Sequence, residues 1–230
     1  MPPSRRGGPP ANLYTADMVT AEGLQQRVEQ ATAPIVALES QQLEQLANFL
    51  LLLQRWNRVH NLTAVRDLDA MIHRHLTESL AAGPWIEGEH CCDAGSGAGL
   101  PGVPLAIAQP HRQFLLVERA GKKAAFLEHV AQQLRLNNLT VLQTDLKDFR
   151  PARGFATVVA RALAPLPKLI PMVAHLLGHH GRLVALKGPA VERELEKLPR
   201  GFKLASMQAL PLGGRDSRVV VITAEDGARA

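Results

Sequence analysis

The chain has 230 residues, of which 46% are hydrophobic and 20% are charged. This length can bury the core of one α/β domain with a modest extension, and it disfavours two full domains. Lysine and arginine number 26 against 21 acidic residues, a mild basic excess that favours a polyanionic partner such as RNA. The apolar runs are too short to span a membrane and the N-terminus lacks the pattern of a signal peptide, so we expect a cytoplasmic protein.

The cysteines and histidines predict neither a disulfide nor a metal site. Cys91 and Cys92 are adjacent and could bridge only with strain, and the sequence has no second cysteine pair to complete a zinc site. The nine histidines show no ligand spacing beyond HRH and HH. We expect reduced cysteines that pack as small apolar groups, and no bound metal.

The first third of the chain reads as a tail followed by helices. Residues 1–20 begin with a segment rich in proline, glycine and arginine and are expected to be disordered. Helical periodicity follows to about residue 60, with Ser40 as the expected N-cap of the second helix. A third helix is expected to start at a capping Asp67 and to stop at Gly83. Residues 21–84 are therefore predicted to form a helical extension.

Residues 85–230 alternate short apolar runs with helical stretches, and they are predicted to form the main domain. Strands are expected near residues 90–94, 113–118, 139–143, 155–160 and 182–187. Strands that alternate with helices predict right-handed crossovers and a mostly parallel, doubly wound sheet. The last two apolar runs, 202–210 and 218–224, are joined by a turn and predict an antiparallel pair at the sheet edge. The fold prediction is a Rossmann-like α/β domain of seven strands that forms one compact unit with the extension.

A glycine-rich turn, DAGSGAG, starts at Asp93 after the first expected strand. In open α/β sheets the ligand lies at the carboxyl ends of the strands, and the first turn carries the glycines. The third glycine of the dinucleotide pattern would fall on Leu100, and no Lys-Ser or Lys-Thr pair closes a phosphate loop. Gly95, Gly97 and Gly99 instead favour S-adenosylmethionine, because bare backbone accommodates its methionine portion while the Asp93 carboxylate can meet its positive charge.

Acidic residues close the next two expected strands. Glu118 ends the second strand about twenty residues after the loop, where a carboxylate can accept hydrogen bonds from both ribose hydroxyls. Asp145 lies just past the third strand, where an acid and the neighbouring backbone could read the adenine amino group. Each feature alone is compatible with a tight turn or a solvated strand end. Together, at successive strand ends, they predict a methyl-donor site.

Six motifs, in chain order, resemble the bacterial ribosomal RNA small-subunit methyltransferase G family, once called glucose-inhibited division protein B. The motifs are RWNRVHNLTAVRD, RHLTESL, DAGSGAGLPGVPLAI, VERAGKKAAFLEHV, ARALAPL and LKG, and the resemblance spans about residues 40 to 224. It implies a class I methyltransferase fold with an N-terminal helical extension. It also implies transfer of a methyl group from S-adenosylmethionine to guanine N7 of one nucleotide of 16S ribosomal RNA, guanosine 527 in the usual numbering.

The resemblance also implies particular contacts with the methyl donor. Matched to the family's motifs, the donor-binding positions are Gly95, Leu100, Leu146, Lys147 and Arg161. They join the residues already inferred from strand-end positions, so the expected donor site draws on the turns after the first, second and third strands and on the end of the fourth.

The chain departs from the family's pattern at three places. The family usually shows Arg-Ala-Glu where this chain has Asp145, Leu146 and Lys147. Backbone contacts to adenine could survive that change, whereas the Lys147 side chain cannot mimic a carboxylate. Glu78 stands where the family usually has aspartate, and Ala160 stands where it usually has serine.

Basic side chains at strand ends and in the following turns are candidates for RNA contact. They are Arg74 and His75 on the third helix, Lys122 and Lys123 after the second strand, Arg161, and Lys187 at the end of the fifth strand. Phosphate contacts would position the substrate, and base contacts would select it. The alternatives are a solvated helix face for the paired lysines, a structural ion pair for Arg161 and a simple strand-ending turn for Lys187.

The expected chemistry needs no general base, because guanine N7 presents a free lone pair and no proton. The enzyme must instead align N7 with the methyl carbon. Arg161 is the candidate for positioning, since a charge that closes an apolar strand is costly unless it is paired. We expect a monomer whose partner is 16S ribosomal RNA or the small ribosomal subunit.

Other functions remain open at this stage. One is a methyltransferase that acts on another RNA or on a small molecule. Another is a non-catalytic RNA-binding module, which the intact glycines of the loop and Glu118 disfavour. A nicotinamide-dependent oxidoreductase is disfavoured by the missing third glycine of the dinucleotide pattern and by the antiparallel strand pair.

Overall fold

The computed structural model describes residues 21–210 and 216–225, so the tail predicted at 1–20 lies outside the described residues. The extension begins with α1 (Ala21–Thr32) and α2 (Ser40–His60), as the periodicity predicts. The apolar positions of α2 that recur at helical spacing are buried, namely Leu43, Leu46, Leu50 and Leu53. Within the described part of the chain, no helix combines the length and apolar content that a membrane span requires.

The N-cap of α2 differs from the prediction. Ser40 is the first residue of the helix, and Glu39 occupies the cap position with an extended backbone. The reason lies three residues further on, where the side chain of Gln42 accepts a hydrogen bond from the Glu39 N–H at 2.9 Å. The Glu39 side chain in turn accepts from the backbone N–H of Gln42, so the two residues form a capping box. This arrangement satisfies a backbone donor that a serine cap would have left to solvent.

The third predicted helix is not uniform. It consists of α3 (Leu68–Met71), the π-helical segment η1 (Ile72–Thr77) and α4 (Glu78–Ala81), and the short 3-10 turn η2 (Gly83–Trp85) follows. Asp67 caps α3 as predicted, because its carboxylate accepts the Ala70 N–H at 2.8 Å. The hydroxyls of Thr77 and Ser79 donate to carbonyls four residues earlier, and such competition for carbonyls distorts helices. Single π-helical turns are frequent at functional sites.

Seven strands form one sheet in the order β3-β2-β1-β4-β5-β7-β6. The strands are β1 (His90–Ala94), β2 (Gln113–Val117), β3 (Leu139–Leu142), β4 (Phe155–Arg161), β5 (Leu177–Lys187), β6 (Phe202–Leu210) and β7 (Ser217–Ala224). The first five run parallel, and β7 pairs antiparallel with both β5 and β6. The predicted mostly parallel sheet with an antiparallel edge pair is confirmed.

Strand β5 begins at Leu177, five residues before its predicted start at 182. Its first part reads GHHG and carries no apolar alternation, so the sequence pattern does not predict a strand there. The strand fits there because its glycines let two backbones approach closely: a Cβ at Gly181 would lie 2.6 Å from the carbonyl oxygen of Phe155. The register with β4 shifts in this region, between Phe155 and Thr157.

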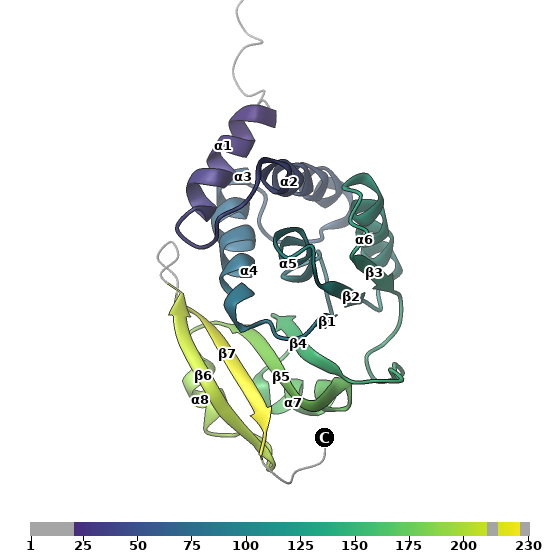
Figure 1. The fold of residues 1–230 in the computed structure, drawn as a ribbon, viewed down its shortest axis with the longest axis vertical. Helices are drawn as coiled ribbons and strands as arrows, with labels where there is room; N and C mark the ends of the chain where they lie inside the picture. The colour runs from purple at the N-terminus through teal and green to yellow at the C-terminus, as the bar shows by residue number, and fades with distance from the viewer. Residues whose placement is uncertain (1–20, 211–215, 226–230) are drawn as a thin grey trace, which may run out of the picture.

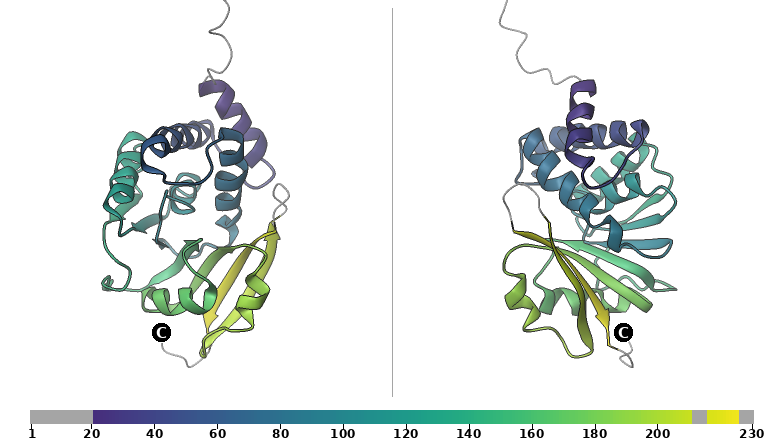
Figure 2. Two further views of the ribbon diagram at one scale, coloured as in Figure 1. Left: turned by 180° about the vertical axis from the view of Figure 1, so that it is seen from behind. Right: turned by 60° about the vertical axis from the view of Figure 1, so that its left-hand side comes forward.

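Helices cover both faces of the sheet (Figure 1). On one face, the extension, α5 (Gly102–Ala108) and α6 (Gly121–Gln133) bury their apolar side chains in one shared core. On the other, α7 (Leu166–Val173), η3 (Ala174–Leu176) and α8 (Val191–Leu195) enclose a second core. Figure 2 shows from two further sides that the extension lies beside α5 and α6. The division at residues 84 and 85 stays a prediction, since one core crosses it.

Candidate active site

A cavity of about 470 Å³ lies at the carboxyl ends of β1, β2 and β4, where open α/β sheets bind ligands. We call it the first cavity. Its lining contains seven of the residues predicted for the donor site and lacks Asp93, Gly99 and Lys147. The seven are Gly95, Gly97, Leu100, Glu118, Asp145, Leu146 and Arg161. The Lys147 side chain is exposed, and its backbone N–H donates to the Asp145 carboxylate at 3.1 Å. The spatial grouping expected from successive strand ends is therefore present.

The glycine loop forms one wall of the first cavity, and each of its glycines has a positive φ. The φ angles are 70° at Gly95, 59° at Gly97 and 82° at Gly99, a region that L side chains rarely adopt. A Cβ at Gly95 would come within 2.8 Å of Leu163, and one at Gly99 within 2.7 Å of Val103. At Gly97 the nearest atom would be 3.8 Å away, so this backbone faces open space. Packing within the protein therefore requires glycine at 95 and 99, and Gly97 is the position where bare backbone is open to a ligand.

Glu118 ties the loop to the second strand end. Its Oε2 accepts the Gly97 N–H at 2.8 Å and its Oε1 accepts the Ala120 N–H at 2.8 Å, while the residue is only 6% exposed. A carboxylate offers about four lone-pair sites, so each oxygen can still accept another hydrogen bond. Glu118 can thus hold the loop and receive ribose hydroxyls at the same time.

Asp93 lies elsewhere than expected. It is 1% exposed and does not line the first cavity, and its Oδ2 accepts the Gly102 N–H at 3.0 Å beneath the loop. Burial raises the pKa of this carboxyl to about 7. A Cβ at Gly102 would lie 2.5 Å from Asp93 Oδ2, so the two residues fit as a pair. Asp93 anchors the start of α5 and is not placed to meet a donor's positive charge.

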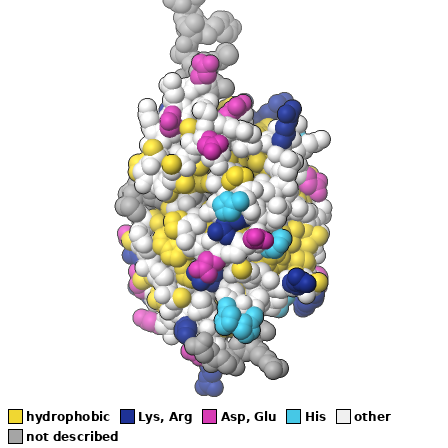
Figure 3. All heavy atoms as spheres, viewed as in Figure 1, with side chains coloured by type: hydrophobic (Ala, Val, Ile, Leu, Met, Phe, Trp, Pro, Cys, Tyr) yellow, Lys and Arg dark blue, Asp and Glu magenta, His cyan; other side chains and the backbone are white. Residues whose placement is uncertain are grey.

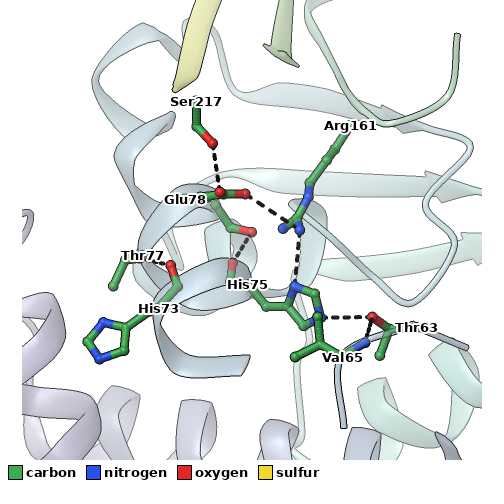
Figure 4. Close-up of polar contacts among 9 residues, drawn as sticks. Thr63, Val65, His73, His75, Thr77, Glu78, Arg161 and Ser217 are labelled. Carbon is green, nitrogen blue, oxygen red and sulfur yellow. Dashed lines mark hydrogen bonds and ion pairs between the residues drawn. The ribbon is translucent and has the colours of Figure 1, made fainter. Parts of the chain in front are cut away.

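A chain of polar contacts joins the extension to the end of β4 (Figure 4). Thr63 Oγ1 lies 3.0 Å from His75 Nε2, and His75 Nδ1 lies 3.0 Å from Arg161 Nη2. The same Nη2 is 3.5 Å from Glu78 Oε2, and Ser217 donates to Glu78 Oε1 at 2.8 Å. The sequence did not predict this series of contacts, because His75 and Arg161 are 86 positions apart.

The hydrogen bonds fix the tautomer of His75. A guanidinium nitrogen can only donate, so Nδ1 must accept from Arg161 and the ring proton must sit on Nε2, where it points at Thr63. Burial, together with the charge of Arg161, lowers the pKa of His75 to about 4. His75 is 3% exposed and lines the first cavity. At neutral pH it is an uncharged part of the wall, so it cannot act as a cationic phosphate contact.

Arg161 and Ala162 also line a second cavity, of about 560 Å³, which extends to the end of β5. We call this the second cavity. Ala162 has a φ of 52°, a conformation that costs an L residue roughly 1 kcal/mol. Such strain persists only where the surrounding structure fixes it, and it is common at functional sites. The two cavities therefore share one wall.

The basic RNA-contact candidates fall into different environments. Lys122 is exposed on α6, whereas Lys123 lines the first cavity. Arg74 lines the second cavity and has no ion pair among the described residues. Lys187 lines the same cavity, but its ammonium is occupied by Glu194 at 2.8 Å and by a backbone carbonyl. Figure 3 shows basic, acidic and histidine side chains mixed across the middle of one face.

The described residues contain no cluster of three histidine, cysteine or acidic side chains arranged to hold a metal ion. Both cysteines are buried and unpaired within the same ranges. Burial raises the pKa of Cys91 to about 11, so its thiol stays protonated and unreactive at neutral pH.

Comparison with known proteins identifies close relatives. Residues 42–217 match the family model described as rRNA small subunit methyltransferase G. A protein of Legionella pneumophila strain Corby, named ribosomal RNA small subunit methyltransferase G, is 43% identical over 159 residues, which cover 69% of this chain and 76% of that protein. A protein of the same name from Alkalilimnicola ehrlichii is 45% identical over 171 residues, covering 74% of this chain and 78% of that protein.

Solved structures share the fold at low sequence identity. The ribosomal protein L11 methylase of Lactobacillus delbrueckii subsp. bulgaricus superposes with a TM-score of 0.52 at 17% identity, covering 66% of this chain and 79% of that one. Aeropyrum pernix fibrillarin with bound S-adenosyl-L-methionine gives 0.51 at 18% identity, covering 65% and 74%. These structural similarities show the fold, whereas the sequence match over most of the chain shows the family. The protein belongs to the rRNA small subunit methyltransferase G family.

Proposed function

We propose that this methyltransferase transfers a methyl group from S-adenosylmethionine to N7 of one guanine in 16S ribosomal RNA, guanosine 527 in the usual numbering. The observation that carries the proposal is the first cavity, where a glycine loop and two strand-end carboxylates meet beside Arg161. Membership of the family supports the RNA substrate. The cytoplasmic location and the monomeric state stay predictions.

The residues of the first cavity suit the parts of the donor. The backbone at Gly95 and Gly97 would lie against the methionine portion, and Glu118 would accept from the ribose hydroxyls. Asp145 and the buried Leu146 would flank adenine. Lys147 lies outside the cavity and would act through Asp145, because its backbone N–H donates to that carboxylate at 3.1 Å. When bound, the donor supplies a methyl group activated by a sulfonium charge.

The chain's own task is alignment. Guanine N7 has no proton to lose, and the site accordingly places a neutral imidazole there with both ring nitrogens engaged. Holding two reactants at near-attack distance can lower a barrier by about 7–11 kcal/mol. A rigid wall suits this task, and the contacts from Thr63 to Ser217 fix Arg161 in one orientation.

The test is methyl transfer from labelled S-adenosylmethionine to small ribosomal subunits that lack the modification, followed by mapping of the labelled nucleotide. Label at a single guanine N7 of 16S RNA is expected. Transfer to naked 16S RNA alone would mean that the substrate is the free RNA and not the assembled subunit. Label on another RNA or on a small molecule would overturn the proposal. Binding of the donor without transfer to any acceptor would favour the non-catalytic module.

A variant of the loop tests the donor site separately. Gly97→Val places a branched side chain at a φ of 59° and on the face that the ligand must approach, so donor binding should be lost. Calorimetry with S-adenosylhomocysteine measures this directly, and thermal melting checks that the variant folds. Unchanged affinity in a folded variant would mean that the donor binds elsewhere.

A further inference from the structure

The second cavity has the size and the balanced charge of a nucleobase site. Its volume of about 560 Å³ lies within the usual range for small-molecule pockets. Its charged lining consists of three cations and three carboxylates, namely Arg74, Arg161, Lys187, Glu78, Glu194 and Asp216. A bare phosphate would need a positive excess, and an apolar ligand would leave the free Nη1 of Arg161 without an acceptor. The lining suits an uncharged occupant that carries both hydrogen-bond donors and acceptors.

The position of the second cavity ties it to the methyl-donor site. Arg161 and Ala162 line both cavities, so an occupant of the second cavity that touches this wall lies next to the first. An acceptor atom must approach the donor's methyl carbon within about 3–3.5 Å. The shared wall is therefore where a reacting base has to present its N7 edge.

At this wall, a free donor lies beside a carboxylate. Arg161 uses Nη2 for His75 and Glu78, while its buried Nη1 has no hydrogen-bond acceptor among the described residues. Glu78 accepts from Ser217 through Oε1 and faces Arg161 through Oε2 at 3.5 Å. Since a carboxylate has about four lone-pair sites, Glu78 can accept a further hydrogen bond.

We propose that the second cavity receives the acceptor guanine and that the Arg161–Glu78 pair selects it, with Arg161 donating to O6 and Glu78 accepting from N1–H. This inference rests on the proposed function. Guanine presents an acceptor at O6 next to a donor at N1, which complements the pair. Adenine presents a donor at N6 next to an acceptor at N1, so like groups would face each other and stay unsatisfied.

The same contact explains how N7 is presented. O6 and N7 lie on one edge of guanine. A hydrogen bond from Arg161 to O6 therefore holds N7 at the wall that the two cavities share. The base must leave its stack to enter, as bases do in other enzymes that modify them.

The experiment compares two RNA substrates with two forms of the enzyme. Small subunits are reconstituted with 16S RNA that carries either guanosine or 2-aminopurine riboside at the target position. 2-Aminopurine keeps N7 but lacks O6 and has an acceptor at N1. The wild type should prefer guanosine, and Glu78→Gln should reduce that preference in kcat/KM by about tenfold, because the amide loses the charge-assisted bond to N1–H and can donate to the analogue. Comparing the two preferences cancels the intrinsic reactivity of each base.

The control is Glu192→Gln, the same substitution at a half-exposed glutamate that pairs with Arg218 at 3.0 Å and lines neither cavity. It should keep the wild-type preference. If Glu78→Gln slows both RNAs by the same factor, Glu78 only supports Arg161 and the inference is wrong, although methylation of guanosine by the wild type would still uphold the proposed function. No methylation by the wild type would overturn both. Should Glu78→Gln fail to fold, Ser217→Ala, which frees the Glu78 side chain, must lower the preference in the same direction.

Discussion

The carboxyl ends of β4 and β5 carry the same signal in the sequence and do different things in the structure. Arg161 and Lys187 each close an apolar parallel strand, and the two strands are neighbours. The Lys187 side chain is 9% exposed, and its ammonium donates to Glu194 at 2.8 Å and to the Ala164 carbonyl at 2.9 Å. Arg161 contacts His75 and Glu78 through one nitrogen and keeps another without an acceptor among the described residues.

The difference comes from the number of donors and of local acceptors. Lysine has three donors on one compact charge, whereas arginine has five in a rigid fork. Glu194 also accepts the Leu166 N–H at 2.7 Å, so the Lys187 pair fastens β5 to α7 and α8. Arg161 lines both cavities, and the contacts with His75 and Glu78 leave its Nη1 without an acceptor among the described residues. A cation at a strand end serves the fold when its donors are used up and can serve a ligand when they are not.

The largest expected effect follows removal of the Arg161 guanidinium, whose donors are not all used within the protein. Arg161→Ala should lower kcat/KM for methyl transfer by about 10²–10³-fold, the usual loss when a positioned donor is removed from a reacting group. The melting temperature should also fall, because Glu78, whose side chain is 13% exposed, loses its cation, so transfer is measured on the folded variant below its melting range. Transfer kinetics on small subunits and thermal melting measure the two quantities.

Arg218→Ala is the matched control for that variant. Arg218 pairs with Glu192 and lines neither cavity, so its loss should leave methyl transfer close to the wild-type rate. Full activity of Arg161→Ala would mean that the arginine has only a structural role. An equal loss in both variants would mean that the effect is not specific to the shared wall.

The next effect should appear in stability. Lys187→Met removes one partner of a nearly buried pair and leaves Glu194 without its cation, which should lower the free energy of unfolding by about 3 kcal/mol. Methyl transfer by the folded fraction should stay within a few-fold of the wild type. Adding Glu194→Gln should restore part of the stability. Urea denaturation and kinetics below the melting range test this, and an activity loss like that of Arg161→Ala would remove the distinction between the strand ends.

Much of the fold was predictable from local sequence signals. Apolar runs that alternate with helical patterns located six of the seven strands closely, and the terminal pair gave the antiparallel edge. The early part of β5 was missed, because its pairing depends on close contact between the backbones of Gly181 and Phe155 and not on apolar side chains. The π-helical segment was also missed, since the residues around it fit an ordinary helix equally well.

The site was predictable where position along a strand decides it. The loop glycines, Glu118 and Asp145 follow successive strands, and parallel topology brings such ends together. The placement of Asp93 was not predictable, because β1 is buried on both faces and its sequence gives no alternation to say which way the side chain points. The contact of His75 with Arg161 depends on the packing of the extension, for which neither residue carries a local signal.

The smallest effect concerns His75, the residue that gives the β4 end its extra contact. Its pKa is about 4 in the folded chain against an ordinary 6.5, so between these values the unfolded chain binds a proton that the folded chain does not. The stability that depends on neutral His75 is therefore present near pH 7 and is lost as the pH falls toward 4. Between pH 7 and pH 5 this loss amounts to about 2 kcal/mol.

Asp93 works in the opposite direction. Its pKa of about 7, against an ordinary 3.8, makes the folded chain bind a proton first, so stability rises as the pH falls through 7. The wild-type free energy of unfolding should thus change little between pH 7 and pH 5. The His75→Gln variant keeps Asp93 but lacks the opposing histidine, so on going from pH 7 to pH 5 its free energy of unfolding should rise by about 2 kcal/mol relative to the wild type, as measured by urea denaturation. Parallel curves would mean that His75 is charged in the folded chain. A charged imidazole cannot accept from Arg161, and the contact that distinguishes the end of β4 from that of β5 would then not exist.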